Sequence, residues 1–249
     1  MKKRITIPAR YGSTRLPAKL LIEIAGKPLL QHTYERARAC NFDSILIATD
    51  HKDIANLCKK IGAEWVMTSD THSTGTDRIA EAMVKQGYAD EDILLNLQGD
   101  EPLIPAANIL KVVENLEDHP GADVATLCEE MTDKHDIFNP NYVKVIFDRK
   151  QYALYFSRAP IPWARDDFPG QMPEQSCYFR HIGLYAYRGH FLKTYPTLAE
   201  PPIEQLERLE QLRVLYHGYK IHVDYAPEPN PPGVDTAASL NEVRKLLEG

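Results

Sequence analysis

Basic residues near the start of the chain have the types and spacing that would bind a polyphosphate. Positions 1–22 hold six Lys or Arg and no Asp or Glu, whereas the whole chain has 29 basic and 35 acidic residues. Arg10, Arg15 and Lys19 lie in or just beyond the segment that follows the first predicted strand. In an open α/β sheet this segment lies at the carboxyl edge, where ligands bind. The alternative is a basic loop that contacts only solvent.

This loop is not one of the standard phosphate-binding loops. It contains a single glycine, Gly12, so the GxGxxG pattern of dinucleotide-binding proteins is absent, and GxxxxGK[ST] does not occur in the chain. The sequence therefore disfavours an NAD-dependent oxidoreductase and a P-loop kinase.

Two aspartates occupy positions that suit a divalent metal ion. Asp100 follows the apolar run 93–97, which predicts a buried central strand that carries Gln98 and Asp100 to the ligand-binding edge. Asp235 follows Gly233 and Val234 and precedes the last predicted helix. Mg²⁺ prefers oxygen ligands and commonly takes one or two carboxylates. The alternatives are a turn residue for Asp100 and a helix N-cap for Asp235.

Short β-branched runs precede helix-like segments through the first half of the chain, which is typical of an α/β fold. The predicted strands are 5–8, 45–49, 65–68 and 93–97, and the predicted helices are 28–40, 53–60, 76–86 and 105–118. Because helical crossovers connect parallel strands, we expect a doubly wound, mostly parallel sheet.

The pattern becomes strand-rich after residue 123. The predicted strands there are 123–130, 142–147, 151–157 and 178–187, with a proline-rich loop at 159–173. Helices at 203–216 and 236–247 flank a strand at 221–225. We expect one domain, 1–249, in which about 123–190 form an antiparallel extension.

Composition excludes several classes of protein. A net charge of −6 and a pI near 5.9 disfavour a nucleic-acid-binding protein, which needs a surplus of basic residues. Apolar runs are too short to span or insert into a membrane, so we expect a cytoplasmic protein. The four cysteines form no CxxC pair, which argues against a zinc site or a disulfide framework.

Seven segments in order resemble the sugar-acid cytidylyltransferases, and within them the enzymes for 3-deoxy-manno-octulosonate (Kdo). The segments are 7–19 (IPARYGSTRLPAK), 72–78 (HSTGTDR), 96–102 (NLQGDEP), 152–158 (YALYFSR), 180–185 (RHIGLY), 210–213 (EQLR) and 233–236 (GVDT). Together they span nearly the whole chain.

The resemblance implies a nucleotide-diphospho-sugar transferase-like fold, a homodimer with strand 178–187 and the preceding loop as its interface, and Mg²⁺ as cofactor. It implies nucleotidyl transfer from CTP to the anomeric hydroxyl of Kdo, giving CMP-Kdo and pyrophosphate for lipopolysaccharide inner-core synthesis. The implied catalytic residues are Lys19, Asp100 and Asp235, the two aspartates being the metal ligands. The implied CTP-binding residues are Pro8, Ala9, Arg10, Ser13, Arg15, Lys19, Thr74, Gly75 and Arg78.

The acceptor has one carboxylate and many hydroxyls, which call for cationic and hydrogen-bonding side chains. The residues implied to bind it are Gln98, Arg158, His181, Tyr185, Glu210 and Gln211. Glu210 and Gln211 belong to the predicted helix 203–216, whose apolar stripe includes Leu206 and is expected to pack inward. The alternatives are a solvated helix face for these two residues and a core imidazole for His181.

Two other functions remain open at this point. One is a cytidylyltransferase for another sugar acid, such as 8-amino-Kdo. The other is a non-catalytic nucleotide-binding protein, against which the presence of both Asp100 and Asp235 counts.

Overall fold

The computed structural model describes residues 1–12, 16–72, 74–171, 173 and 177–248. Its strands are β1 (Lys3–Ala9), β2 (Glu23–Ile24), β3 (Lys27–Pro28), β4 (Ser44–Thr49), β5 (Glu64–Met67), β6 (Ile93–Asn96), β7 (Val124–Glu130), β8 (Lys144–Phe147), β9 (Ala153–Ser157), β10 (Phe179–Arg188) and β11 (Ile221–Tyr225).

Helices alternate with these strands, as the sequence pattern predicts. The α-helices are α1 (Leu29–Arg38), α2 (Lys52–Ile61), α3 (Gly75–Lys85), α4 (Ala106–Asp118), α5 (Lys134–Phe138), α6 (Gly189–Thr194), α7 (Pro202–Glu207), α8 (Gln211–Tyr216) and α9 (Ala237–Glu248). The 3₁₀ helices are η1 (Lys19–Leu21) and η2 (Tyr195–Thr197).

One nine-stranded sheet organises the described residues. Its main order is β11-β7-β10-β6-β1-β4-β5, and β8 pairs with β10 and β9 at the flank. Along the main order every pair is parallel except those that include β10, which runs antiparallel to both β6 and β7. The mostly parallel, mixed α/β sheet confirms the predicted fold class.

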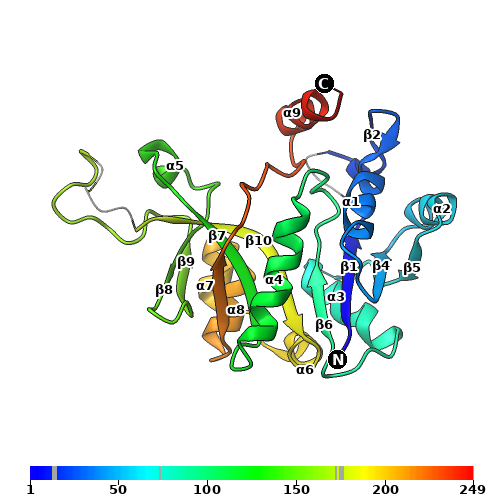
Figure 1. Cartoon of the computed structure of the whole chain (residues 1–249), viewed down its shortest axis with the longest axis horizontal. Helices are drawn as coiled ribbons and strands as arrows, with labels where there is room; N and C mark the ends of the chain where they lie inside the picture. Colours follow the sequence, from blue (N-terminus) through cyan, green and yellow to red (C-terminus); the bar gives the residue numbers. More distant parts are fainter. Residues whose placement is uncertain (13–15, 73, 172, 174–176, 249) are drawn as a thin grey trace.

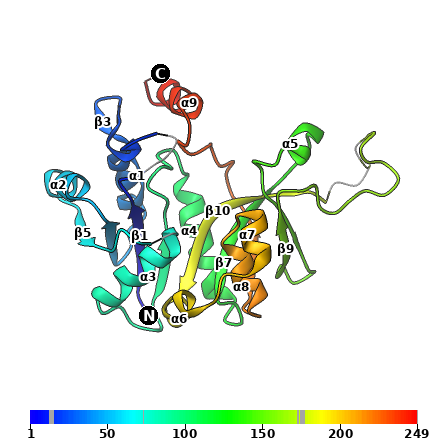
Figure 2. The same ribbon diagram turned by 180° about the vertical axis from the view of Figure 1, so that it is seen from behind.

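Helices cover both faces of the sheet (Figures 1 and 2). Alternate side chains of a strand point to opposite faces, so Leu94 and Leu95 of β6 enter different cores. Leu95 packs with apolar residues of α1, α2, α4 and α9, whereas Leu94 packs with residues of α3, α6 and α8. The sheet is therefore buried on both sides, which explains the continuous apolar run 93–95.

Strand β10 joins the predicted extension to the rest of the sheet. Residues 185–188 pair with β6 on one side, and 185–187 pair with β7 on the other. The second half of β10 has its backbone groups paired within the sheet, so a dimer interface there would have to form through side chains, and the predicted interface at 178–187 stays a prediction. The first half pairs with β7 and β8, and the described part of 159–173 projects from the sheet (Figure 1).

The predicted helix 203–216 is two helices, α7 and α8. Arg208 ends α7 in the left-handed conformation, at φ 54°, which a continuing helix cannot accommodate. Across the break, Arg213 donates two hydrogen bonds to the Glu204 carboxylate, at 2.8 and 2.7 Å. The break also turns Leu206 to solvent, where it is 84% exposed, so the predicted inward stripe is wrong at that position.

Among the described residues, no helix is both long enough and apolar enough to cross a membrane.

Among the described glycines, Gly189 has the least room for a side chain. A Cβ there would lie 2.4 Å from the Ala89 carbonyl oxygen and 2.7 Å from the Met83 methyl group. We expect Gly189→Ala to lower the free energy of unfolding by about 1–3 kcal/mol, because neighbouring backbone must shift. Chemical denaturation measures the change.

Gly12→Ala is the matched control, since a Cβ at Gly12 meets no atom of the described residues within 4 Å. A Gly189→Ala protein as stable as this control would show that the contact between α6 and the 83–90 segment is looser than described.

Candidate active site

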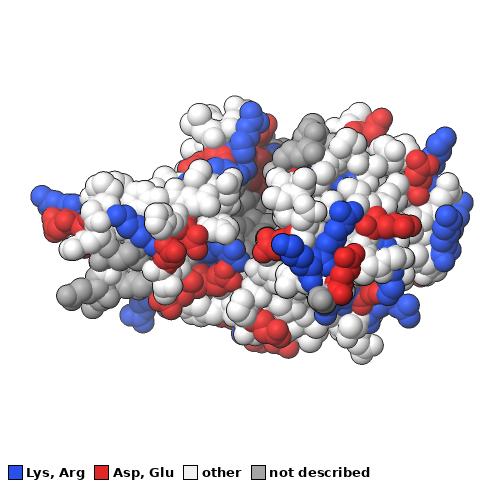
Figure 3. All heavy atoms as spheres, turned by 90° about the horizontal axis from the view of Figure 1, so that it is seen from above, with Lys and Arg blue, Asp and Glu red and all other residues white. Residues whose placement is uncertain are grey.

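The carboxyl ends of β1 and β6 open onto two adjoining cavities. Figure 3 looks onto this edge and shows a hollow between the two halves of the molecule, with both acidic and basic side chains around it. One cavity has a volume of about 200 Å³ and the other of about 460 Å³. Both are lined by Gln98, Asp100, Glu210 and Asp235. A group bound in one cavity can therefore meet a group bound in the other beside these four residues.

Lys19 lies between the two aspartates that the sequence singles out. Its ammonium donates to Asp100 and to Asp235, the latter at 2.8 Å, and to the Val234 carbonyl at 3.0 Å. Burial disfavours the charged amine, but the two carboxylates outweigh burial and raise the pKa of Lys19 above its ordinary value. The side chains of Lys19, Asp100 and Asp235 thus form one charged cluster between the cavities.

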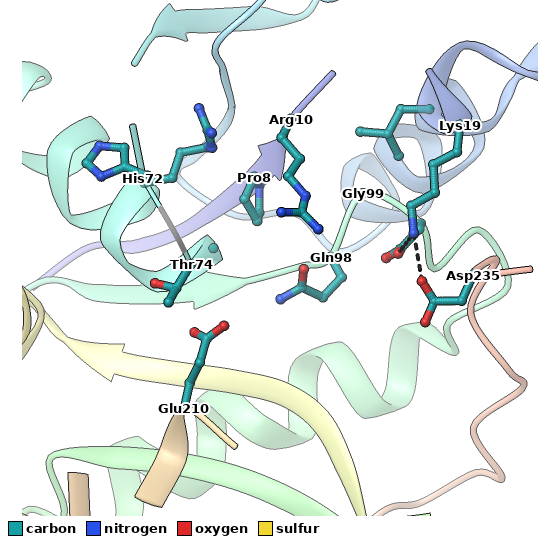
Figure 4. A pocket seen from close by; sticks show the side chains of 13 residues that line it. Pro8, Arg10, Lys19, His72, Thr74, Gln98, Gly99, Glu210 and Asp235 are labelled. Carbon is teal, nitrogen blue, oxygen red and sulfur yellow. Dashed lines mark hydrogen bonds and ion pairs between the residues drawn. The ribbon is translucent and has the colours of Figure 1, made fainter. Parts of the chain in front are cut away.

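The carboxylates of Asp100 and Asp235 both contact Lys19, whatever part these residues play in the turn and at the start of α9. At the start of α9, Thr236 Oγ1 accepts the Ser239 backbone N–H at 3.2 Å, and Ser239 Oγ accepts that of Asp235 at 2.9 Å. The carboxylate of Asp235 points to Lys19 instead, as Figure 4 shows. Asp100 does lie in a turn, yet its carboxylate also reaches Lys19.

Asp100 and Asp235 fit an Mg²⁺ ion. They are hard oxygen donors that converge on a single positive charge, and Mg²⁺ commonly needs only one or two protein carboxylates because water and phosphate oxygens complete its shell. Groups of three or more His, Cys, Asp or Glu able to hold a metal do not occur in the described parts of the chain. The donor set thus suits a cation brought in with a polyphosphate rather than a closed structural metal site.

The smaller cavity has the features of a nucleotide site. Lys19 and Asp235 lie on one side of it and Thr74 and Glu210 on the other, with Arg10 and Gln98 extending between them (Figure 4). Helix α3 begins here, so its backbone N–H groups and the positive end of its dipole favour an anion. Of the predicted CTP-binding residues, Pro8, Arg10, Lys19, Thr74, Gly75 and Arg78 line the cavity.

One predicted CTP-binding residue that the structure describes, Ala9, does not line this cavity. Ala9 has a fully buried side chain that packs into the core, because alternation along β1 turns it away from the edge. Only the backbone of Ala9 could contribute to binding. Ser13 and Arg15 lie outside the described residues.

Arg78 makes its strong contacts on the side away from the cavity centre. Its guanidinium donates to Asp50 at 2.8 Å and to Thr68 Oγ1 at 2.6 Å, and its side chain is buried. The ion pair with Asp50 connects α3 to the end of β4, and the hydrogen bond to Thr68 connects it to the end of β5. The placement favours a role in holding the start of α3 rather than in direct phosphate binding.

His72 also lines the nucleotide cavity, a position that the sequence did not predict. Its Nε2 contacts the Glu81 carboxylate, which also accepts the Ser69 backbone N–H at 2.8 Å. Glu81 therefore fixes the segment that leads into α3. The signal in the sequence was weak, because a lone histidine in a loop has many other roles.

The larger cavity collects most of the predicted acceptor-binding residues. Gln98, Arg158, Tyr185, Glu210 and Gln211 line it. Gln211 is only 6% exposed, so the solvated-face alternative fails for it, and its Nε2 has no partner among the described residues. A buried unpaired donor at a cavity wall indicates that a ligand or water completes its hydrogen bonds.

Sequence reasoning missed other residues of this wall, among them Glu101, Tyr195 and Arg208. The hydroxyl of Tyr195 is buried without a partner in the described residues. Burial, the neighbouring Asp100 carboxylate and other charges raise the pKa of Glu101 to about 7. The position of Glu101 beside Asp100 was the one available signal for it.

His181 does not line either cavity. Its Nε2 lies 3.0 Å from Thr126 Oγ1, and its ring packs beside Tyr185 at a centroid distance of 5.3 Å. Burial, together with the Arg180 charge, lowers the pKa of His181 to about 3, so the imidazole is neutral. His181 is half-buried and contacts both Thr126 and Tyr185, so a supporting role beside Tyr185 fits this placement better than direct contact with an acceptor.

A doubly wound sheet whose carboxyl edge holds a cavity lined by Arg10 and Lys19, an acidic pair and a second polar cavity is typical of a nucleotidyltransferase. The cytidylyltransferase family profile matches residues 5–221 of this chain. A 3-deoxy-manno-octulosonate cytidylyltransferase from Francisella philomiragia is 53% identical over 244 residues, covering 98% of each chain. The chain belongs to the 3-deoxy-manno-octulosonate cytidylyltransferase family.

Other relatives and solved structures agree. A 3-deoxy-manno-octulosonate cytidylyltransferase from Nitrosococcus oceani is 50% identical, covering 99% of this chain and 97% of that protein. A solved structure of CMP:2-keto-3-deoxy-manno-octonic acid synthetase complexed with CTP superposes with a TM-score of 0.91 at 41% identity, covering 100% and 99% of the two chains. A 4-diphosphocytidyl-2C-methyl-D-erythritol synthase shares the fold, with a TM-score of 0.65 at 13% identity and coverage of 99% and 98%.

Glu210 gives a pH-dependent prediction. Its carboxylate accepts the Thr76 hydroxyl at 3.0 Å, and burial raises its pKa from 4.5 to about 6. Between these values the folded protein binds more protons than the unfolded chain, so this carboxyl weakens folding as the pH rises. The glutamine in Glu210→Gln does not titrate, so this loss of stability is absent from the variant. We therefore expect the free energy of unfolding of Glu210→Gln, minus that of the unmodified protein, to increase by about 1–2 kcal/mol from pH 4.5 to 7.

Glu35→Gln is the control, because the hydrogen bond from Lys27 lowers the pKa of Glu35 and the pH trend should have the opposite sign. Urea unfolding at each pH measures both variants. A Glu210→Gln difference that is constant with pH would mean that this carboxyl is hydrated in the folded protein.

Proposed function

We propose that this chain transfers the cytidylyl group of CTP to the anomeric hydroxyl of Kdo and releases pyrophosphate. The observation that carries the proposal is that the cavity lined by Arg10 and Lys19 meets the second polar cavity at Asp100 and Asp235. The anomeric oxygen forms a bond to the α-phosphorus, the bond to the bridging oxygen of pyrophosphate breaks, and the hydroxyl proton passes to solvent. Pyrophosphate leaves with the electron pair.

The nucleotide cavity supports triphosphate binding. Arg10 and Lys19 reach into it, and the N-terminus of α3 adds backbone donors. Nucleotidyl transfer gathers negative charge on phosphoryl oxygens, so fixed positive charges and correct positioning account for most of the catalysis. Lys19 can exchange a carboxylate partner for a phosphate oxygen without leaving its place between the cavities.

We infer that Asp100 and Asp235 hold Mg²⁺ during the reaction. The ion would supply Lewis-acid stabilisation of phosphoryl charge. The support is the convergence of the two carboxylates on one positive charge, together with the match between that donor set and magnesium chemistry.

We infer that the larger cavity binds the sugar acid. Arg158 supplies a cation for the carboxylate, and the amides and the phenol of Gln98, Gln211 and Tyr185 suit hydroxyls. His181 acts beside Tyr185. A site of this kind rejects an acceptor that lacks a matching group, because its own buried polar atoms then stay unpaired.

A homodimer and a single domain, 1–249, remain proposals. The dimer is supported by the large apolar side chains that the flank of the sheet exposes, Leu154 of β9 at 60% and Trp163 at 55%. The single domain is supported by the pairing of β10 with β6, which joins residues 123–190 to the first half of the sheet. The cytoplasmic location stays a prediction.

The direct test is a pyrophosphate-release assay with CTP, Kdo and magnesium chloride. We expect release that needs all three components and yields CMP-Kdo, with CTP far better than ATP, because a pocket fitted to a pyrimidine excludes a purine. Replacing Kdo by 8-amino-Kdo tests the other acceptor. Nucleotide binding without pyrophosphate release would favour the non-catalytic alternative.

Removal of Asp100 tests the metal assignment. We expect Asp100→Ala to lower kcat by several orders of magnitude and to weaken the dependence of the residual rate on magnesium concentration, because a charge-stabilising ligand is lost. Asp224→Ala is the control, since Asp224 is paired with Lys111 at 2.8 Å and lines neither cavity. Near-normal turnover in folded Asp100→Ala protein would refute the metal role.

A further inference from the structure

Lys144 is a buried lysine that the reaction described above does not use. It is the first residue of β8, and its side chain is 0% exposed. Its ammonium donates to the carbonyl oxygens of Asn139 at 3.1 Å, Tyr142 at 2.6 Å and Arg158 at 2.6 Å. An ammonium has three donor hydrogens, so these bonds use all of them.

Burial of this charge costs folding free energy, which its three hydrogen bonds offset. The ammonium makes no ion pair within the described residues, and burial lowers the pKa of Lys144 to about 8 even though the Glu207 charge opposes that shift. An apolar side chain of similar volume would fill the same space without the desolvation penalty of a buried charge. The effect of the charge is local: it fixes the 139–142 turn relative to the end of β9.

Arg158 is held by hydrogen bonds to Glu207 and to the 139–142 turn. The Arg158 backbone N–H donates to the Glu207 carboxylate at 2.9 Å, and its Nε donates to the Glu207 carbonyl at 2.7 Å. Its Nη1 donates to the Pro140 carbonyl at 2.9 Å, within the turn that Lys144 fixes. Lys144 therefore acts on Arg158 in two ways. It bonds the Arg158 carbonyl directly, and it fixes the turn whose Pro140 carbonyl accepts from Arg158 Nη1.

The environment of Arg158 leaves its charge available to a ligand. Carbonyl oxygens accept from its Nε and Nη1, and its Nη2 has no partner among the described residues. The residue lines the larger cavity. A guanidinium recognises a carboxylate through a fork of fixed geometry, so a small rotation of Arg158 would weaken binding.

We propose that Lys144 is a positioning residue that orients the Arg158 guanidinium toward the carboxylate of the sugar acid. This inference rests on the proposed function and adds the structural basis for recognising an acidic acceptor. Lys144 itself does not touch the substrate: the Arg158 peptide group and the 139–142 turn lie between them.

The test compares Lys144→Met with the unmodified enzyme. We expect the KM for Kdo to rise at least about tenfold while the KM for CTP changes little, because the lost bonds hold a residue of the acceptor cavity and none of the nucleotide cavity. The melting temperature should fall modestly, because three buried carbonyl oxygens lose their donor. Lys111→Met is the matched control: it removes a lysine from α4 that pairs with Asp224 and lines neither cavity. Parallel rises in both KM values, or none, would overturn the proposal.

A double-mutant cycle with Arg158→Ala separates positioning from general structural support. In the Arg158→Ala background, Lys144→Met should have little further effect on the KM for Kdo, because the group that it positions is gone. Independent, multiplying effects would contradict the proposal. The methyl ester of Kdo gives a second readout: the unmodified enzyme should prefer the acid strongly, and Lys144→Met should lose most of that preference.

Lys144→Gln covers the case in which the methionine variant does not fold. Its amide has two donor hydrogens in place of three, so an intermediate KM for Kdo is expected. A folded glutamine variant with an unchanged KM overturns the proposal. So does failure of both variants to fold, since the charge would then serve the fold and not Arg158. Absence of CMP-Kdo formation by the unmodified enzyme would instead refute the proposed function.

Discussion

The bonds between Lys19 and the two carboxylates are the constraint on which the active site depends. Asp100 and Asp235 lie 81 and 216 residues from Lys19 in the sequence, so three distant segments meet at one ammonium. Two carboxylates this close repel each other strongly unless a cation lies between them. The same requirement that keeps the carboxyl-terminal segment against β1 and β6 also keeps the two carboxylates together in the position where we propose that a metal ion binds.

The two proposed substrate cavities are built by different halves of the sheet. Parallel strands and the start of α3 build the nucleotide cavity, where uniform strand direction puts loop ends and a helix N-terminus at one edge. The acceptor cavity draws on β10, the end of β9 and the junction of α7 and α8. Gln98, Asp100, Glu210 and Asp235 line both cavities, and the remaining lining residues of the larger cavity come mostly from separate elements.

Much of the fold and of the nucleotide site could be predicted from the sequence. The runs before each helix identify β1, β4, β5 and β6, and a buried strand ending at Asn96 puts Gln98 and Asp100 at the ligand-binding edge. These predictions succeed because periodicity and chain connectivity are local properties. The type of chemistry follows because basic residues cluster where acidic ones are absent.

The remaining parts depend on contacts that no local pattern encodes. The leucines of 203–216 favour one helix, and only the folded chain shows that Arg208 interrupts it while Glu204 pairs with Arg213. Arg78 is a predicted CTP-binding residue, and only the folded chain shows that its guanidinium pairs with Asp50. Tyr195 reaches the acceptor cavity from η2, which lies next to α3 only in the folded structure.

The insertion of β10 between β6 and β7 also orders events during synthesis of the chain. Both strands leave the ribosome long before residues 179–188, yet each depends on β10 as its neighbour. Until β10 emerges, their facing edges carry unpaired backbone groups, which are templates for pairing with other chains. The nascent chain is therefore most prone to aggregate while the segment between β7 and β10 is translated, and a chain that stops before residue 179 retains that hazard permanently.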